Sequence, residues 1–287
     1  MSTNHELDLQ FSPRMWAKRA PPEKIVQMHI DFVTKVSETV KRNIPNQLNV
    51  AYGPSTEEKL DIYGIDLPPN SPILVYIHGG YWQQLNKDIS SFSAESFYKY
   101  GVKVIVVGYT LCPNCSLNKI VEEIESAFLA CLEYAKKCGS KGIYICGHSA
   151  GAHLAAILFR NFFHSLPQVD QKYLKAVYYI SGVFDLVPIV ETYVNDALKL
   201  TPTVANDLSP LNQPIQADND IAFFVIVGEY ESPTFHEQSK AFYEKLRNYN
   251  YTAKFIQVPS VDHFDIVENL SNANHEIFKI LANAIQK

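Results

Sequence analysis

The feature that most constrains the fold is a series of apolar segments of strand length, separated by segments with helical periodicity. A last strand is expected at 254–258, and the apolar segments span residues 73–77, 102–107, 143–146, 176–180 and 221–227. They lack polar alternation, as expected of parallel strands covered on both faces. Between them, apolar side chains recur at helical spacing over 120–132, 152–163 and 235–246, and a last helix is expected over 275–285. Repeated strand–helix units predict an α/β fold with a mostly parallel, doubly wound sheet flanked by helices.

Three further segments complete the predicted organisation. A helical run over 23–42 precedes an antiparallel pair of strands at 48–52 and 59–63. Residues 185–214 fit no sheet unit, because they contain Pro and Asn and are only partly helical. We interpret them as a small lid-like insertion over the carboxyl-terminal edge of the sheet, where ligands bind in such folds. The length suits one large domain, so we expect residues 1–287 to form a single domain.

Composition excludes several classes of function. The formal net charge of −5 predicts no binding to nucleic acid or to an anionic membrane. No apolar run approaches the roughly 18 residues of a membrane span, and Met1–Gln10 lacks the apolar core of a secretory signal. Five cysteines without framework spacing fit reduced thiols, so a cytoplasmic location is expected. No His, Cys or Asp spacing indicates a metal site, and we expect no cofactor.

The sequence Gly147-His148-Ser149-Ala150-Gly151 follows the predicted strand at 143–146 and precedes the predicted helix at 152–163. In this context, G-x-S-x-G is the nucleophile elbow of the α/β-hydrolase fold. The glycines allow close backbone approach, and the helix N-terminus favours developing negative charge beside the serine. We predict that Ser149 is a catalytic nucleophile. The alternative is a turn of small residues that only packs, because the motif alone occurs often by chance.

A second glycine motif, His78-Gly79-Gly80-Tyr81-Trp82, ends the predicted strand at 73–77. Attack of a serine on a carbonyl creates an oxyanion, which requires fixed N–H donors. We expect one donor from Ala150, directly after the nucleophile, and the others from this loop, at Gly79, Gly80 and Tyr81. The alternative is a plain Gly-Gly turn.

A serine nucleophile needs a general base, and in this fold the chain order is serine, acid, histidine. His263 follows the last predicted strand and is the predicted base. The acid should follow the strand at 221–227, where both Glu229 and Glu231 occur. We favour Glu231, which lies three residues after Gly228, the usual spacing in this fold; Glu229 remains the rival.

The other histidines have different interpretations. His148 and His153 lie in or just after the elbow and are expected to pack or hydrogen-bond locally. His236 is expected to open a helix. The remaining histidines lie outside the loops that could reach Ser149: His5, His29, His164 and His275.

Four motifs together resemble the animal kynurenine formamidases (arylformamidases) of the α/β-hydrolase superfamily. They are His-Gly-Gly-Tyr-Trp at 78–82, Gly-His-Ser-Ala-Gly-Ala-His-Leu at 147–154, Ser-Gly-Val-Phe-Asp-Leu at 181–186 and Asp-His-Phe-Asp-Ile-Val-Glu-Asn at 262–269. The resemblance implies a triad of Ser149, Glu231 and His263, although the family commonly has Asp at the position of Glu231. It also implies hydrolysis of N-formyl-L-kynurenine to formate and L-kynurenine in tryptophan catabolism.

We expect His78, Tyr81, Trp82 and Phe184 to contact the substrate, with Trp82 restricting the site to a small acyl group. The two bulky aromatics Trp82 and Phe184 have an alternative role as core residues. A broad-specificity carboxylesterase of the hormone-sensitive-lipase-like type would share every triad residue. A catalytically silent hydrolase-like binding module would typically lack the serine or the histidine. A small-molecule substrate is the expected partner, and the sequence leaves open whether the chain forms a homodimer.

Overall fold

The fold is built on one sheet, in a computed structural model that describes residues 5–217 and 220–286. The strand order is β1-β2-β4-β3-β5-β6-β7-β8. The strands are β1 (Asn46–Ala51), β2 (Lys59–Tyr63), β3 (Ile73–Ile77), β4 (Lys103–Val107), β5 (Ile143–His148), β6 (Leu174–Ile180), β7 (Ala222–Tyr230) and β8 (Thr252–Asp262). β3 to β8 are parallel, whereas β2 is antiparallel to both β1 and β4. The predicted parallel sheet and its antiparallel N-terminal pair are confirmed.

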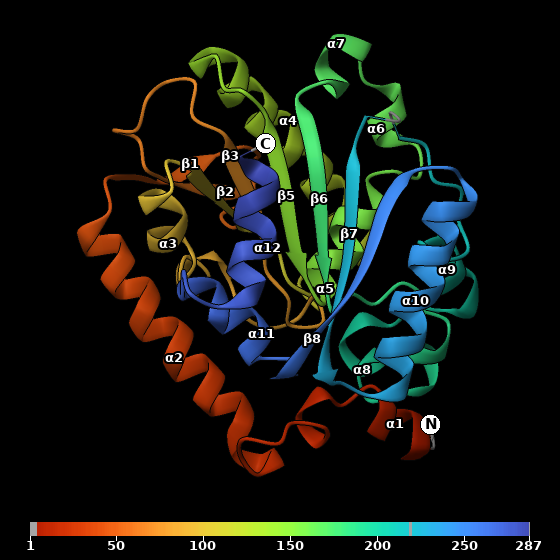
Figure 1. The fold of residues 1–287 in the computed structure, drawn as a ribbon. Coiled ribbons are helices and arrows are strands. Elements are labelled where there is room, and N and C mark those ends of the chain that lie inside the picture. The colour runs from red at the N-terminus through yellow and green to blue at the C-terminus, as the bar shows by residue number, and fades with distance from the viewer. Residues whose placement is uncertain (1–4, 218–219, 287) are drawn as a thin grey trace.

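The two faces of the sheet contact different core layers, because side chains alternate along a strand. In β3, Ile73 and Val75 belong to one layer, and Leu74 and Tyr76 to the other. The first layer is covered by α4 (Leu117–Cys138), α5 (Ala150–Ile157) and α10 (Pro233–Asn248). The second is covered by α2 (Pro22–Asn43), α3 (Ala94–Lys99), α11 (Asp265–Glu268) and α12 (Glu276–Ile285) (Figure 1). Coverage of both faces explains the absence of polar alternation.

The helix predicted over 152–163 is wrong in extent. α5 ends at Ile157, and a separate short helix, α6 (Phe162–Ser165), follows. The apolar pattern does not mark this break, because Phe159, within the break, and Phe163, after it, are both buried. A further short helix, α7 (Gln168–Gln171), leads into β6.

The carboxyl-terminal edge of the sheet is flanked by two segments. Residues 185–214 lie between β6 and β7 and contain η3 (Pro188–Glu191), α8 (Asn195–Leu198) and α9 (Pro202–Asp207). The chain start contributes α1 (His5–Gln10) and η1 (Pro13–Met15). In Figure 1, α1 and α8 lie below the arrowheads of the central strands. The sequence predicts residues 185–214 at this edge, but not the segment at the chain start.

Two short helices complete the described elements: η2 (Lys87–Ile89) and η4 (Asn269–Ser271). Within the described residues, no helix combines the length and apolar character needed to cross a bilayer.

Candidate active site

Ser149 occupies a tight turn between β5 and α5. Its φ of 54° and ψ of −118° lie outside the regions that non-glycine residues usually adopt. The Ser149 N–H donates to the Ile180 carbonyl of β6 at 2.8 Å, and the Ser149 carbonyl accepts from the His153 N–H at 3.2 Å. These bonds to a strand and to α5 hold the turn in the strained geometry typical of a nucleophile elbow.

The glycines on either side of the serine are required by close backbone packing. A Cβ atom on Gly147 would lie 2.3 Å from the Gly151 carbonyl oxygen. A Cβ atom on Gly151 would lie 2.1 Å from the Ile77 carbonyl oxygen. Only glycine at these two positions lets α5 approach β3 and present Ser149 above the sheet.

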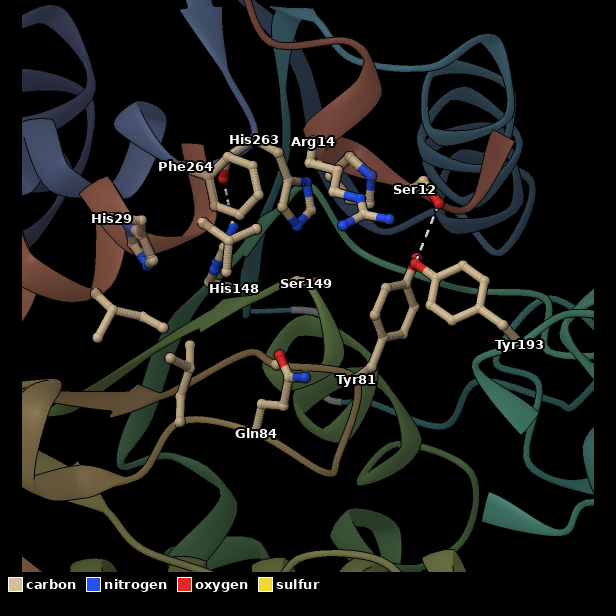
Figure 2. Close-up of a pocket in the computed structure, with 15 residues that line it drawn as sticks. Ser12, Arg14, His29, Tyr81, Gln84, His148, Ser149, Tyr193, His263 and Phe264 are labelled. Carbon is tan, nitrogen blue, oxygen red and sulfur yellow. Dashed lines mark hydrogen bonds between the residues drawn. The ribbon is translucent and has the colours of Figure 1, made fainter. Parts of the chain in front are cut away.

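His263 and Glu231 meet beside Ser149. His263 follows β8 and Glu231 follows β7, and the His263 Nδ1–H donates to the Glu231 carboxylate oxygens at 2.9 and 3.1 Å. Both side chains are buried, with exposed fractions of 5% and 0%. His263 lines the same cavity as Ser149, and Figure 2 shows its ring pointing toward the serine. The structure therefore brings together three residues from three different strand ends.

Glu229, the rival acid, faces another group. Its Oε2 accepts from the Ser260 backbone N–H at 2.6 Å. Of the two carboxylates that the sequence left open, Glu231 is the one that contacts the histidine.

The glycine loop (residues 78–82) lies against Ser149. A Cβ atom on Gly79 would lie 3.0 Å from the Ser149 Cβ. Gly80 has a φ of +100°, and a Cβ there would lie 2.2 Å from the Gln84 carbonyl oxygen. Among the described residues, the Gly80 and Tyr81 N–H groups donate to no acceptor. Ala150 begins α5, where N–H groups have no partner within the helix. Three donors are therefore available next to Ser149.

His148 supports the loop that carries His263. Its Nε2–H donates to the His263 carbonyl oxygen at 2.9 Å. Burial, together with the neighbouring histidines, lowers the pKa of His148 well below its ordinary value. The ring is therefore a neutral hydrogen-bonding group, in agreement with its predicted local role.

His78, expected to contact the substrate, lies beneath the glycine loop instead of along the cavity. Its ring stacks on Tyr109 with centroids 4.3 Å apart, and its Nδ1–H donates to the Gly79 carbonyl at 2.9 Å. Burial lowers the pKa of His78 to about 4. The side chain is placed to support the loop.

Trp82 and Phe184 also lie away from the cavity, and both have an exposed fraction of 0%. The Trp82 Nε1–H donates to His153 Nδ1 at 3.2 Å, and the His153 Nε2–H donates to the Leu208 carbonyl at 2.7 Å. Phe184 stacks on Phe242 with centroids 4.1 Å apart. The expectation of direct substrate contact is corrected for both, because the turn directs the indole into the core and Phe184 packs on α10. Trp82 instead connects the glycine loop to α5 and, through His153, to the insertion.

Replacement of Trp82 by Phe is expected to lower the free energy of unfolding by about 1–3 kcal/mol, because it leaves a buried imidazole nitrogen without its donor. Urea denaturation measures this loss. Trp16→Phe is the matched control, because the Trp16 indole donates to the Leu9 carbonyl at the surface. Equal losses in the two variants would contradict a special role for the Trp82 bond.

His153 is expected to make stability depend on pH. Burial lowers its pKa to about 4 from the ordinary 6.5, so below about pH 6.5 the unfolded chain binds more protons than the folded chain. The contribution of neutral His153 to the free energy of unfolding is therefore fully present above pH 6.5. It declines as pH falls from 6.5 toward 4. Between about pH 7.5 and 5.5, wild type should lose about 1 kcal/mol more than His153→Gln. Urea denaturation at the two pH values tests this, and parallel losses would refute it.

The cavity beside Ser149 contains residues that the sequence did not indicate. Ser12 and Arg14 come from the N-terminal segment, Tyr193 from the insertion and His29 from α2. Tyr81 also lines it, and is the only one of the four expected contact residues that does so within the described part of the chain. The unfilled space of this cavity, including its opening to solvent, is about 640 Å³.

His29 lies on α2 and lines the cavity, but among the described residues no hydrogen bond joins it to Ser149. α2 packs beside α11, where His29 Nδ1 lies 2.8 Å from Glu268 Oε1. No sequence motif marks Ser12, Arg14 or Tyr193, because their place at the site depends on how distant segments fold over the sheet. Within residues 5–217 and 220–286, no group of side chains is arranged to hold a metal ion.

The family model described as the alpha/beta hydrolase fold matches residues 74–265. A kynurenine formamidase of Danio rerio is 34% identical over 289 residues, covering 98% of this chain and 96% of that protein. A kynurenine formamidase of Drosophila melanogaster is 28% identical over 293 residues, covering 97% and 96%. The chain belongs to the kynurenine formamidase family. The resemblance found in the four motifs is confirmed over nearly the whole length.

Solved structures similar to this family member share its architecture. A candidate thioesterase from Silicibacter sp. tm1040 has a TM-score of 0.79 at 24% identity, covering 99% of this chain and 100% of that one. An esterase from Pyrobaculum calidifontis has a TM-score of 0.70 at 18% identity, covering 92% of each chain. At these identities the likeness concerns the fold alone, and it confirms the α/β-hydrolase architecture.

Proposed function

We propose that this protein hydrolyses N-formyl-L-kynurenine to formate and L-kynurenine, with Ser149, His263 and Glu231 as its catalytic triad. The observation that carries the proposal is the contact between Glu231 and His263, whose ring lines the same cavity as Ser149. Membership of the kynurenine formamidase family supports the substrate. The alignments cover 96% of the length of both kynurenine formamidases.

In the acylation step, the Ser149 oxygen attacks the formyl carbon while His263 Nε2 accepts the hydroxyl proton. Glu231 holds the imidazole with its Nδ1–H directed at the carboxylate, and it stabilises the imidazolium that forms. The C=O electron pair moves onto oxygen, and the N–H groups of Gly80, Tyr81 and Ala150 are placed to stabilise this oxyanion. We include Gly79 in the oxyanion loop as the residue whose missing side chain lets the loop approach Ser149.

Acylation is completed when the C–N bond breaks and His263 transfers its proton to the arylamine nitrogen, so that L-kynurenine leaves as a neutral amine. Water then attacks the formyl ester of Ser149 while His263 accepts a water proton. Formic acid departs and loses its proton to solvent to give formate, while His263 returns the proton that it took from water to the Ser149 oxygen. The site thus completes the cycle with no net gain or loss of protons on the protein.

The experiment that tests this function compares kcat/KM for N-formyl-L-kynurenine with values for phenyl acetate, butyrate and octanoate. We expect N-formyl-L-kynurenine to be the best substrate. Preference for the esters, with no cleavage of the formamide, would instead support the carboxylesterase alternative. A silent binding module would fail to react with a fluorophosphonate probe, whereas the proposed hydrolase should be labelled at Ser149.

Other properties follow from the same proposal. The substrate is a small molecule, as the cavity beside Ser149 suggests. The cysteines are free thiols, which supports a proposed location in a reducing compartment such as the cytoplasm.

A further inference from the structure

The N-terminal segment (residues 11–19) carries a cation into the cavity. Arg14, in η1, lines the same cavity as Ser149 and His263. Figure 2 shows its guanidinium group pointing into this space beside the His263 ring. The segment is far from the elbow in sequence, so the fold alone creates this juxtaposition.

Contacts on the N-terminal side of Arg14 hold the segment in place. Phe11 is 1% exposed, and its carbonyl accepts from the Tyr81 hydroxyl at 2.8 Å and from the Tyr193 hydroxyl at 3.3 Å. Ser12 also donates to the Tyr193 hydroxyl oxygen at 3.1 Å. The glycine loop and the insertion are thus both bonded to the residues directly before Arg14.

Contacts on the C-terminal side anchor the segment to the loop of the catalytic histidine. Arg19 Nε lies 3.0 Å from Asp262, and its terminal nitrogen lies 2.7 Å from Glu268. Tertiary contacts therefore hold the chain on both sides of Arg14. This reduces the conformational freedom that the residue would lose on binding a ligand.

The charge of Arg14 is not neutralised by the protein. Among the described residues it forms no ion pair and no hydrogen bond, and no carboxylate lines the cavity. The neighbouring Tyr81 and Tyr193 hydroxyls already donate to the Phe11 carbonyl. An anionic group entering the cavity would therefore meet one free guanidinium and no opposing acid.

We propose that Arg14 binds the α-carboxylate of the substrate while the formamide lies at Ser149. A guanidinium presents paired N–H donors that match a carboxylate, and such charge-assisted bonds are among the stronger ones. Arg14 is then a specificity-determining residue that selects aryl formamides carrying an amino-acid end. This inference rests on the proposed formamidase function.

The test compares N-formyl-L-kynurenine with N-formylkynuramine, which lacks only the α-carboxylate. In Arg14→Gln, the ratio of the two kcat/KM values should fall about 10- to 100-fold, mainly through the KM of the carboxylate substrate. Arg14→Lys should give an intermediate ratio, because it keeps the charge but loses the fork of donors. Lys18→Gln is the matched control, because it removes one exposed charge from the same segment outside the cavity lining. Its ratio should equal that of wild type.

An unchanged ratio in Arg14→Gln, or a proportional loss on both substrates, would overturn the assignment. A second measurement separates this failure from failure of the proposed function. L-kynurenine should protect Ser149 from fluorophosphonate labelling better than kynuramine does, and Arg14→Gln should remove the difference. Wild type that is labelled but does not cleave N-formyl-L-kynurenine would refute the formamidase function. In that case, comparing the protection given by L-kynurenine with that given by kynuramine would still test the role of Arg14. Equal protection by the two amines would refute it.

Discussion

Replacement of Ser149 by Ala is expected to lower kcat for N-formyl-L-kynurenine by about a million-fold, as loss of the nucleophile does in a well-studied serine protease. The fold should survive, because the turn is held by backbone hydrogen bonds of Ser149 to Ile180 and His153. Steady-state kinetics, fluorophosphonate labelling and thermal unfolding measure the three consequences. Activity above about a thousandth of wild type would remove Ser149 from the nucleophile's role.

Ser181→Ala is the matched control for this variant. Ser181 is buried like Ser149, has a φ of 51° against 54°, and follows the adjacent strand β6. It does not line the cavity. The same chemical change at a residue with nearly the same φ should leave kcat within a few-fold of wild type. A loss in both variants would indicate strain in the turns instead of chemistry.

Replacement of Glu231 by Ala is the second change with a large expected effect, a loss of about 10³- to 10⁴-fold in kcat. The variant leaves His263 Nδ1 without its acceptor, so the imidazole is no longer held in the tautomer that accepts the serine proton. Glu231→Gln preserves the shape of the side chain and should show a loss of similar order. This second variant keeps the test valid if the alanine variant is unstable.

Glu229→Ala is the control for the acid. Among the described contacts, the Glu229 carboxylate accepts only from the Ser260 N–H, so its removal should cost less than about tenfold in kcat. The comparison is made in steady-state assays at a pH where wild type is fully active. The reverse ranking of the two glutamates would transfer the role of the acid to Glu229.

The sequence by itself determined the sheet, the elbow and the histidine, because each depends on local chemistry or on chain order. Continuous apolar runs such as 73–77 favour strands buried on both faces. The glycines around Ser149 are required by backbone contacts within one strand–turn–helix unit, so a short motif is enough to find them. His263 was located by the order of strands along the chain. The helix end at Ile157 was missed because burial continues beyond it.

Only the tertiary structure decided which side chains face the cavity. Tyr81 and Trp82 are adjacent and both have positive φ values, yet one lines the cavity and the other is buried beside His153. The direction of each side chain depends on the packing of α5 and the insertion, which no local pattern encodes. Arg14 reaches the site because distant hydroxyls hold the Phe11 carbonyl and distant acids hold Arg19. Contacts between segments this far apart in sequence form only in the folded chain, and these contacts position the residue that we propose selects the substrate.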